Sequence, residues 1–376
     1  MKPKAILSSH RTQPTVIGTG LIALDVVVNE TRQDGPRLWG GGTCGNVLTI
    51  LSYLGWRSFP IARLADDSAS ELVRKDLARW KVHLDFANLE PRTRAPIIVQ
   101  HLTETASGLP FHRFSWTCPA CGGWLPPYRA VIASTVSAAL PRIARGQVFF
   151  FDRVSRAALT LAKKCFDDGT LIVFEPSCSQ DPQLFREALA LTHILKYSHE
   201  RSRKLRPLLT KTEHVPLLEI ETLGAEGLRF RSQLRGHNST NWQRLDAYEL
   251  KDFRDPSGAG DWCTAGIIHQ LGQGGARTFR RVTHQQLQAT LGFAQALAAW
   301  TCRYEGARGG MYFTERHTLL QEVEWIMKGK TNNLPRPDIP SQVVRSVFEG
   351  LCTGCEEQTQ KSGDRNRRNL KKPSHR

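Results

Sequence analysis

The sequence predicts an α/β fold in which helices cover both faces of a mostly parallel central sheet. Two observations support this prediction: short strand-like runs recur along the chain, and helical stretches lie between them. The strand-like runs are 15–20, 58–64, 147–151, 171–174, 193–196 and 217–222. The 376 residues, of which 40% are hydrophobic and 23% charged, suffice for one large α/β domain or two average ones.

The first strand is followed by a glycine pattern, Gly18-Thr19-Gly20, that superficially matches a dinucleotide-binding fingerprint. That motif requires a helix directly after it, but residues 24–28 are β-branched and strand-like, so we reject a dinucleotide site. The glycine-rich stretch 39–46 then leads into an apolar helix over 47–54. After the strand at 58–64, residues 68–80 have the pattern of an amphipathic helix.

Later segments complete the predicted fold. Residues 97–102 and 111–116 are expected to pair as two strands around a turn at 106–108. Residues 292–304 are rich in alanine and predict a long, closely packed helix. After about residue 330 the composition shifts to Pro, Asn, Arg and Lys, which we interpret as the end of the core fold.

The most informative motif is Asp255-Pro256-Ser257-Gly258-Ala259-Gly260-Asp261, which directly precedes an apolar helical stretch. Small residues let backbone N–H groups approach an anion, and the start of a helix favours negative charge. Because a phosphate would repel an acidic side chain there, Asp261 is best explained as a base that takes a proton from an attacking hydroxyl group. Ordinary helix capping is the alternative, and spacing alone does not separate the two.

The formal net charge of +16 fits a protein that handles anionic substrates, and it also fits weak, non-specific binding to nucleic acid. Residues 358–376 carry seven basic side chains and one aspartate, so we expect a disordered basic tail that makes only non-specific contacts. The sequence has no apolar run long enough to cross a membrane and no signal-peptide core at its start. We therefore expect a cytoplasmic protein.

Two of the cysteine-containing segments suggest a metal site. The chain has nine cysteines, and this odd number favours reduced thiols over a disulfide framework. Cys118 and Cys121 form one pair with two residues between them, and Cys352 and Cys355 form another. Four thiolates complete a tetrahedral Zn²⁺ shell, so we predict one structural zinc site. Two unrelated pairs of thiols are the alternative, because zinc requires the fold to return the C-terminal segment to 118–121.

Taken together, these segments resemble the ribokinase-like (PfkB) family of carbohydrate kinases over roughly residues 15–315. The resemblance implies a three-layer fold with a small β lid, ATP and Mg²⁺ as cofactors, and a sugar as substrate. It also implies that Asp261 is the catalytic base and that the backbone of 258–260 forms the anion hole. Asp255 is at the leading acidic position of the motif, which implies a place near Mg²⁺ or a monovalent cation.

The resemblance assigns residues to both substrates. On the sugar side, Asp25 after the first strand and Gly41, Gly42 and Asn46 of the glycine-rich stretch are expected to bind the sugar. The residues expected to contact the nucleotide lie in three later segments. They are Lys196, Ser198, Thr222, Gly224, Gly227, Gly306 and Ala307.

The sequence departs from the family pattern in two places. Many members carry Asn-x-x-Glu near the phosphates and the metal. If Lys196 and Ser198 align with that pattern, Arg201 takes the glutamate position and Glu200 lies one residue early, which leaves the metal arrangement open. The glycine-rich signature also lacks the usual small residues at 43 and 44, which implies a reshaped sugar pocket.

We therefore predict an ATP-dependent kinase that phosphorylates a hydroxyl group of a sugar or sugar-like molecule. The alternatives are a nucleoside kinase of the same fold, and a kinase-derived binding or regulatory protein without turnover. The kinase domain is expected over 1–330, with the lid around 25–40 and 95–117 as a surface for a homodimer. The extension 331–376 carries the second cysteine pair and the basic tail.

Overall fold

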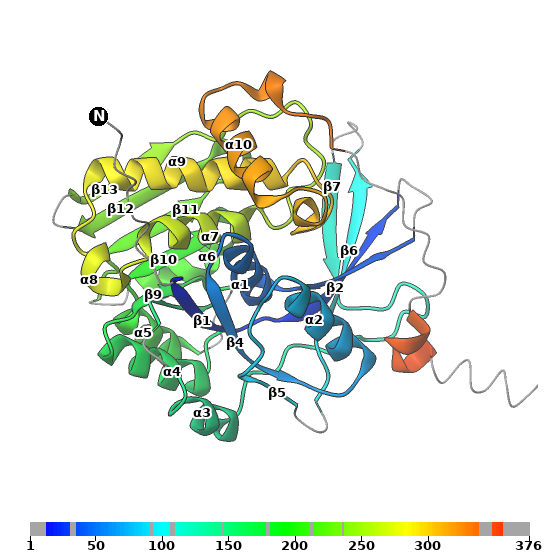
Figure 1. The fold of residues 1–376 in the computed structure, drawn as a ribbon. Coiled ribbons are helices and arrows are strands. Elements are labelled where there is room, and N and C mark those ends of the chain that lie inside the picture. The colour runs from blue at the N-terminus through cyan, green and yellow to red at the C-terminus, as the bar shows by residue number, and fades with distance from the viewer. Residues whose placement is uncertain are drawn as a thin grey trace, which may run out of the picture.

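The computed structural model of this chain contains a large central sheet, helices on both of its faces, and a second, smaller sheet (Figure 1). The described residues are 13–30, 35–89, 93–105, 110–143, 146–177, 181–210, 214–234, 237–337 and 348–355. The predicted turn at 106–108 and the basic tail lie outside them. Among the described helices, none combines the length and the apolar character needed to cross a membrane.

The central sheet has nine strands in the order β13-β12-β11-β10-β9-β8-β1-β4-β5. All neighbours from β11 to β5 are parallel, whereas β12 and β13 are antiparallel and form one edge. The strands are β1 (Thr15–Thr19), β4 (Arg57–Leu64), β5 (Ala87–Leu89), β8 (Val148–Phe151), β9 (Leu171–Phe174), β10 (Ile194–Ser198), β11 (Leu218–Thr222), β12 (Leu228–Leu234) and β13 (His237–Leu245).

The helices form two layers, as crossovers between parallel strands require. One layer comprises α1 (Thr43–Tyr53), α2 (Ser68–Arg79), α7 (Ala259–Leu271), α8 (Gly275–Phe279), α9 (His284–Thr301) and α10 (Arg316–Met327). The other comprises α3 (Ala133–Ala139), α4 (Arg156–Asp167), α5 (Pro182–Leu191) and α6 (His199–Leu209). Because side chains alternate along a strand, Val148 and Phe150 of β8 pack under the first layer, and Phe149 and Phe151 under the second.

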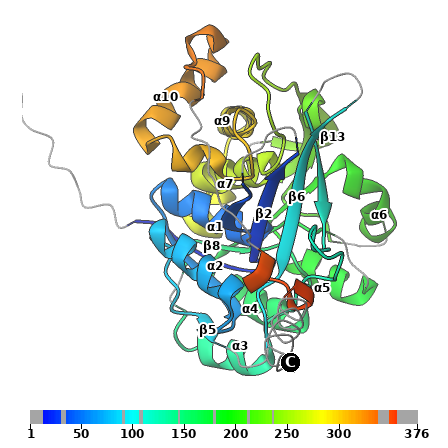
Figure 2. The same cartoon turned by 90° about the vertical axis from the view of Figure 1, so that its right-hand side faces the viewer.

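The small sheet has four strands in the order β3-β2-β6-β7, and it stands at one side of the molecule (Figure 1). Its strands are β2 (Ala23–Asn29), β3 (Arg37–Gly41), β6 (Ile97–Glu104) and β7 (Pro110–Ser115). Figure 2 shows the turn at 348–355 coming back to the foot of this sheet. The α/β fold class with a mostly parallel sheet and a small second sheet is thus confirmed.

Two boundaries differ from the sequence prediction. The alanine-rich helix begins at His284 and not at Gly292, because Thr283 and Gln286 form a capping box and the helix continues through the glycine. Packing also continues past residue 330: Leu334 lies against the main core, and the Lys251 ammonium donates to Asn332 Oδ1 at 2.7 Å.

Candidate active site

Two glycines precede the helices that meet at the candidate site. Gly42 lies directly before α1 and Gly258 directly before α7, and both have a φ of 76°. A Cβ atom at Gly258 would lie 2.4 Å from the Ala307 carbonyl oxygen, and one at Gly42 would lie 2.6 Å from the Leu21 carbonyl oxygen. Both positions therefore require glycine, and each helix presents its positively polarised end without a side chain in front of it.

A chain of hydrogen bonds joins the two helix starts. Asn46 of α1 donates through Nδ2 to Asp261 Oδ2 in the first turn of α7, at 2.7 Å. Asn46 Oδ1 accepts from Arg308 Nε at 3.0 Å, and Arg308 also donates to Asp76 Oδ2 at 2.6 Å and to the Gly40 carbonyl oxygen. Because Arg308 is buried, this network fixes the orientation of the Asn46 amide toward Asp261.

Asp25 lies on β2 against the glycine-rich turn. A Cβ atom at Gly41 would lie 1.8 Å from Asp25 Oδ2, so the carboxyl group fits only because residue 41 has no side chain. Burial raises the pKa of the Asp25 carboxyl to about 7, against the opposing hydrogen bond from the Gly42 N–H group. Asp25, Gly41, Gly42, Asn46 and Asp261 therefore lie in one connected region. It contains the four residues that the sequence analysis expected to bind the sugar and the one it expected to act as the base.

Two further carboxyl groups have raised pKa values. Burial raises the pKa of Asp261 to about 7, and the negative charge of Glu175 adds to this effect. Burial likewise raises the pKa of Asp152, the residue directly after β8, to about 6. Asp152 accepts from the Leu21 N–H group at 2.9 Å and from Arg153 Nη1 at 2.6 Å. The carboxyl groups of Asp25, Asp152 and Asp261 therefore all have pKa values above the ordinary value for aspartate.

Lys196 lies beneath the start of α7. Its ammonium group donates to Glu175 Oε1 at 2.9 Å, and both side chains are buried. Thr264 donates to the other Glu175 oxygen at 2.5 Å. A Cβ atom at Gly260 would lie 3.7 Å from Lys196 Nζ, so the lysine charge is close to the predicted anion hole although one of its donors is used by Glu175.

The predicted nucleotide side consists mainly of backbone turns. Ser198 and Thr222 are register partners at the carboxyl ends of β10 and β11. Gly224 and Gly227 follow in a short 3-10 turn, with φ values of 63° and 93°. The space where a side chain of Gly224 would lie is open, since no atom comes within 4 Å of that position.

Asp255 is fully buried and surrounded by N–H donors. Its oxygens accept from the Gly306 N–H group at 2.7 Å, from the Ser257 N–H group at 2.9 Å and from Gln100 Nε2 at 2.8 Å. A ring nitrogen of His112 lies 3.5 Å away. Gln100 and His112 belong to β6 and β7, so Asp255 ties the small sheet to the loop before α7. The oxygens of Asp255, which the sequence analysis expected to lie near a cation, are therefore used by these donors.

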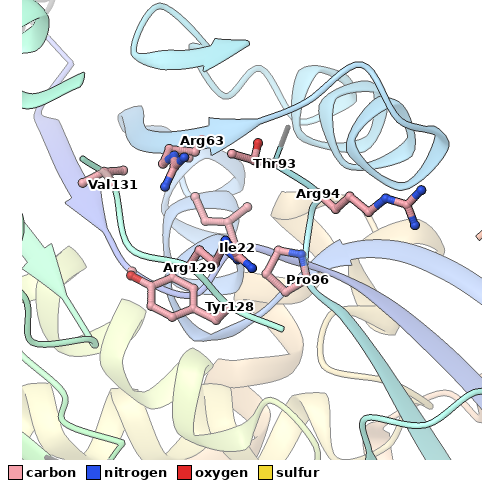
Figure 3. A pocket seen from close by; sticks show the side chains of 10 residues that line it. Ile22, Arg63, Thr93, Arg94, Pro96, Tyr128, Arg129 and Val131 are labelled. Atoms are coloured by element: carbon pink, nitrogen blue, oxygen red, sulfur yellow. The ribbon is translucent and has the colours of Figure 1, made fainter. Parts of the chain in front are cut away.

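A pocket next to Asp152 is lined by arginines (Figure 3). A Cβ atom at Gly20, in the pocket wall, would lie 1.6 Å from Asp152 Oδ1, which places the pocket beside that carboxyl. Arg63 Nη1 donates to the Ala130 carbonyl oxygen at 3.2 Å, whereas its buried Nε has no hydrogen-bond partner among the described residues. The wall also includes Ile22, Arg94, Tyr128 and Arg129.

The comparison with protein families shows to which family the chain belongs. A model of the pfkB family of carbohydrate kinases matches residues 15–312. The chain belongs to the pfkB family. No curated protein sequence matches it significantly.

Solved structures of several kinases have folds similar to that of this pfkB protein. A fructokinase with bound ATP from Xylella fastidiosa has a TM-score of 0.64 at 16% identity, over 84% of this chain and 99% of that chain. A ribokinase from Arabidopsis thaliana, complexed with ribose and ATP, has a TM-score of 0.61 at 17% identity, over 83% and 99%. A nucleoside kinase from Burkholderia thailandensis, in complex with inosine, has a TM-score of 0.59 at 14% identity, over 82% and 96%.

Sequence reasoning missed three residues of the site: Asp76, Asp152 and Arg308. Asp152 follows a predicted strand directly, and the rule that ligands bind at the carboxyl ends of parallel strands could have found it. Asp76 and Arg308 gave no such signal, because each is an ordinary charged residue until the fold buries the pair.

Proposed function

We propose that this protein is an ATP-dependent kinase that transfers a phosphoryl group to a hydroxyl group of a sugar or sugar-like molecule. The observation that supports this most is Asp261, whose carboxyl lies in the first turn of α7 and is held by Asn46 at 2.7 Å. A pKa of about 7 suits a general base, since a base works best when its pKa lies near the working pH.

In the proposed mechanism, Asp261 takes the proton from the attacking hydroxyl group, and Asn46 fixes the direction of its carboxylate. The backbone N–H groups at the start of α7 hold the transferring phosphoryl group as its charge redistributes. Lys196 adds a fixed positive charge behind Gly260. Asp25 binds sugar hydroxyl groups and thereby aligns the attacking oxygen.

The residues present fit ATP, since glycine turns and a helix start form a cradle for its phosphates. Mg²⁺ would neutralise phosphate charge, and it takes most of its ligands from phosphates and water when few carboxylates are offered. Glu175 is committed to Lys196 and Thr264, which leaves Glu200 in the first turn of α6 as the nearby acidic candidate. The positive charge of Arg201 acts on Asp152 and Asp261, so it also reaches the phosphate region.

The arginine-lined pocket favours a sugar substrate that carries an anionic group. Arg63, Arg94 and Arg129 all belong to the wall of this pocket, and a planar guanidinium group suits a carboxylate or a phosphate. Arg94 and Arg129 are exposed there, so they are accessible to an anionic group on the substrate. A nucleoside kinase remains the second candidate, because a nucleoside kinase is among the similar structures.

The test is ADP release by the full-length protein with ATP and Mg²⁺, across neutral sugars, sugar phosphates, sugar acids and nucleosides. We expect turnover with an anionic sugar, a product heavier by one phosphoryl group, and no turnover in Asp261→Asn. Turnover only with nucleosides would establish the second candidate. Ligand binding without ADP release from any compound would instead establish a binding protein without kinase activity.

Arg129→Gln offers a finer test of the anionic group, since Arg129 is exposed in the pocket wall. The variant should raise the KM for the anionic sugar and leave the KM for ATP unchanged. Equal KM values for a sugar phosphate and its neutral parent sugar, in the unaltered protein, would contradict the assignment of this pocket.

A further inference from the structure

Four cysteines that lie far apart in the sequence meet outside the candidate active site. The sulfur atoms of Cys118, Cys121, Cys352 and Cys355 all lie within 4.8 Å of one another. The Cys118 and Cys355 sulfurs are 3.7 Å apart, and the Cys121 and Cys352 sulfurs are 3.5 Å apart. Because this cysteine cluster joins two segments more than 200 residues apart, chance proximity of a local turn does not account for it.

These separations match four thiolates around one tetrahedral ion. With Zn–S bonds of about 2.3 Å, the sulfur atoms of a tetrahedral site lie about 3.8 Å from one another. A disulfide requires about 2.05 Å, well below both measured separations. An iron–sulfur cluster with several iron atoms needs more space between thiolates, since each thiolate then binds a different iron atom.

The backbone on both sides of the cluster is shaped for the sulfur atoms. In the first turn, the Cys118 N–H group donates to the Gly123 carbonyl oxygen at 2.8 Å. The Gly122 N–H group donates to the Cys118 carbonyl oxygen at 2.8 Å. A Cβ atom at Gly123 would lie 3.3 Å from the Cys121 sulfur, and one at Gly354 would lie 3.1 Å from the same atom. Glycine in both turns therefore leaves room for the sulfur atoms to approach one another.

We propose that the cysteine cluster binds one Zn²⁺ ion as a closed structural site. Four thiolate ligands leave no open coordination position, so the ion supplies stability and not chemistry. The choice of zinc over a single iron atom follows from the commoner use of paired Cys-x-x-Cys turns for structural zinc.

The first cysteine turn lies at the end of the small sheet and is attached to two of its strands. Thr117 pairs with Trp124, and the Leu125 N–H group donates to the Trp116 carbonyl oxygen at 2.9 Å, so the first turn closes the strand end of β7. The Ile97 N–H group donates to the Pro126 carbonyl oxygen at 3.1 Å, which attaches the next segment to β6.

The chain then continues directly into the wall of the arginine-lined pocket, to which it contributes Tyr128 and Arg129. The second turn is packed as well, since Leu351 and Cys352 belong to the main core. We therefore infer that zinc ties the C-terminal turn to the foot of the small sheet and thereby fixes the segment that carries Tyr128 and Arg129.

The first experiment measures metal content and does not depend on activity. Full-length protein purified without chelators should contain about one zinc per chain by elemental analysis. Cys121→Ser and Cys355→Ser should each lose the zinc. Cys302→Ser is the matched control, because its sulfur donates to the Ala298 carbonyl oxygen at 3.2 Å and Cys302 is not a member of the cysteine cluster.

Three results would overturn the proposal: protein without metal, iron in place of zinc with the same dependence on the cysteines, or disulfides between the cluster cysteines found by mass spectrometry. Replacement of zinc by Co²⁺ adds a readout, since four thiolates give intense sulfur-to-cobalt charge-transfer bands. A Co²⁺ spectrum with fewer than four thiolates would also contradict the site.

The second experiment tests the task of the ion and rests on the proposed function. Loss of zinc by a chelator, or in Cys121→Ser, should lower the Tm and raise the KM for the sugar more than the KM for ATP. Equal changes in both KM values would contradict the link to the pocket wall. Zinc content and cobalt spectra stay interpretable if the protein proves to have no kinase activity, so the two proposals fail separately.

Discussion

The proposed sugar side and the proposed nucleotide side of the candidate site differ in the groups that form them. On the sugar side, side chains hold one another: Asn46 lies between Asp261 and Arg308, and Asp25 fits against Gly41. On the nucleotide side, glycine turns after β11 supply the shape, and the Ser198 side chain makes no capping hydrogen bond. The first side depends on particular functional groups, and the second on the course of the backbone.

This difference has an energetic basis. Removing one member of a buried polar network leaves its partners without hydrogen bonds, at a cost of about 1–3 kcal/mol for each group. Backbone N–H groups remain in place when a neighbouring side chain is changed. Substitutions on the sugar side should therefore have the larger effects, and the predictions below test that contrast.

Asp261→Asn should have the largest effect. The amide cannot accept the hydroxyl proton, so kcat should fall by about 10²–10⁴-fold. ATP binding should change little, because in the proposed mechanism the phosphates contact the backbone and not this side chain. Initial rates of ADP release and calorimetric titration with ATP provide the two measurements. Near-normal turnover in the variant would show that another group acts as the base.

Asp25→Ala and Thr222→Ala form a matched pair across the two sides. Losing charge-assisted hydrogen bonds to sugar hydroxyl groups should weaken sugar binding by about 10–100-fold in Asp25→Ala. Thr222→Ala removes only a hydroxyl at the end of β11, so both ligands should bind with affinities within about threefold of the original protein. Calorimetry with each ligand checks this contrast, and equal losses of sugar and ATP in Asp25→Ala would break it.

The same contrast explains which parts of the site could be predicted from sequence. The turns at Gly42 and Gly258 were visible because a helix start without side chains needs glycine, and this requirement is local. The network around Arg308 was not visible, because its partners Asp76 and Asn46 come from two helices whose approach depends on the whole fold.

The fold itself was predictable at the level of alternating strands and helices, since each strand has its own apolar run. The start of α9 was misplaced because Gly292 looked like a boundary, whereas the capping box at Thr283 decides where the helix begins. The return of Cys352 to Cys118 could be proposed only from the chemistry of four thiols, and the separation along the chain gave no support for it.

A pH profile should show a smaller but diagnostic effect. Asp261 must be deprotonated to act as a base, and burial raises its pKa to about 7. The value of kcat/KM should therefore rise with pH, level off above an apparent pKa near 7, and fall about tenfold per pH unit well below it. Rates measured from pH 5 to pH 9 in buffers of constant ionic strength test this expectation. A profile flat down to pH 5 would exclude a base with a raised pKa.

The smallest expected effect concerns stability on the sugar side. The pKa of Asp25 is about 7 in the folded protein, compared with 3.8 as its ordinary value, so between these values the folded state binds the extra proton. The stability from this proton is present at low pH and is lost as the pH rises through 7.

Asp25→Asn, which stays neutral, should therefore gain on the order of 1 kcal/mol relative to the original protein between pH 5 and pH 8, allowing for partial solvent screening. Thr222→Ala is the control from the nucleotide side: it keeps Asp25, so its stability should change between the two pH values by the same amount as that of the original protein. Urea unfolding at both pH values measures the difference, and an equal pH dependence in all three proteins would show that burial of Asp25 carries no stability cost.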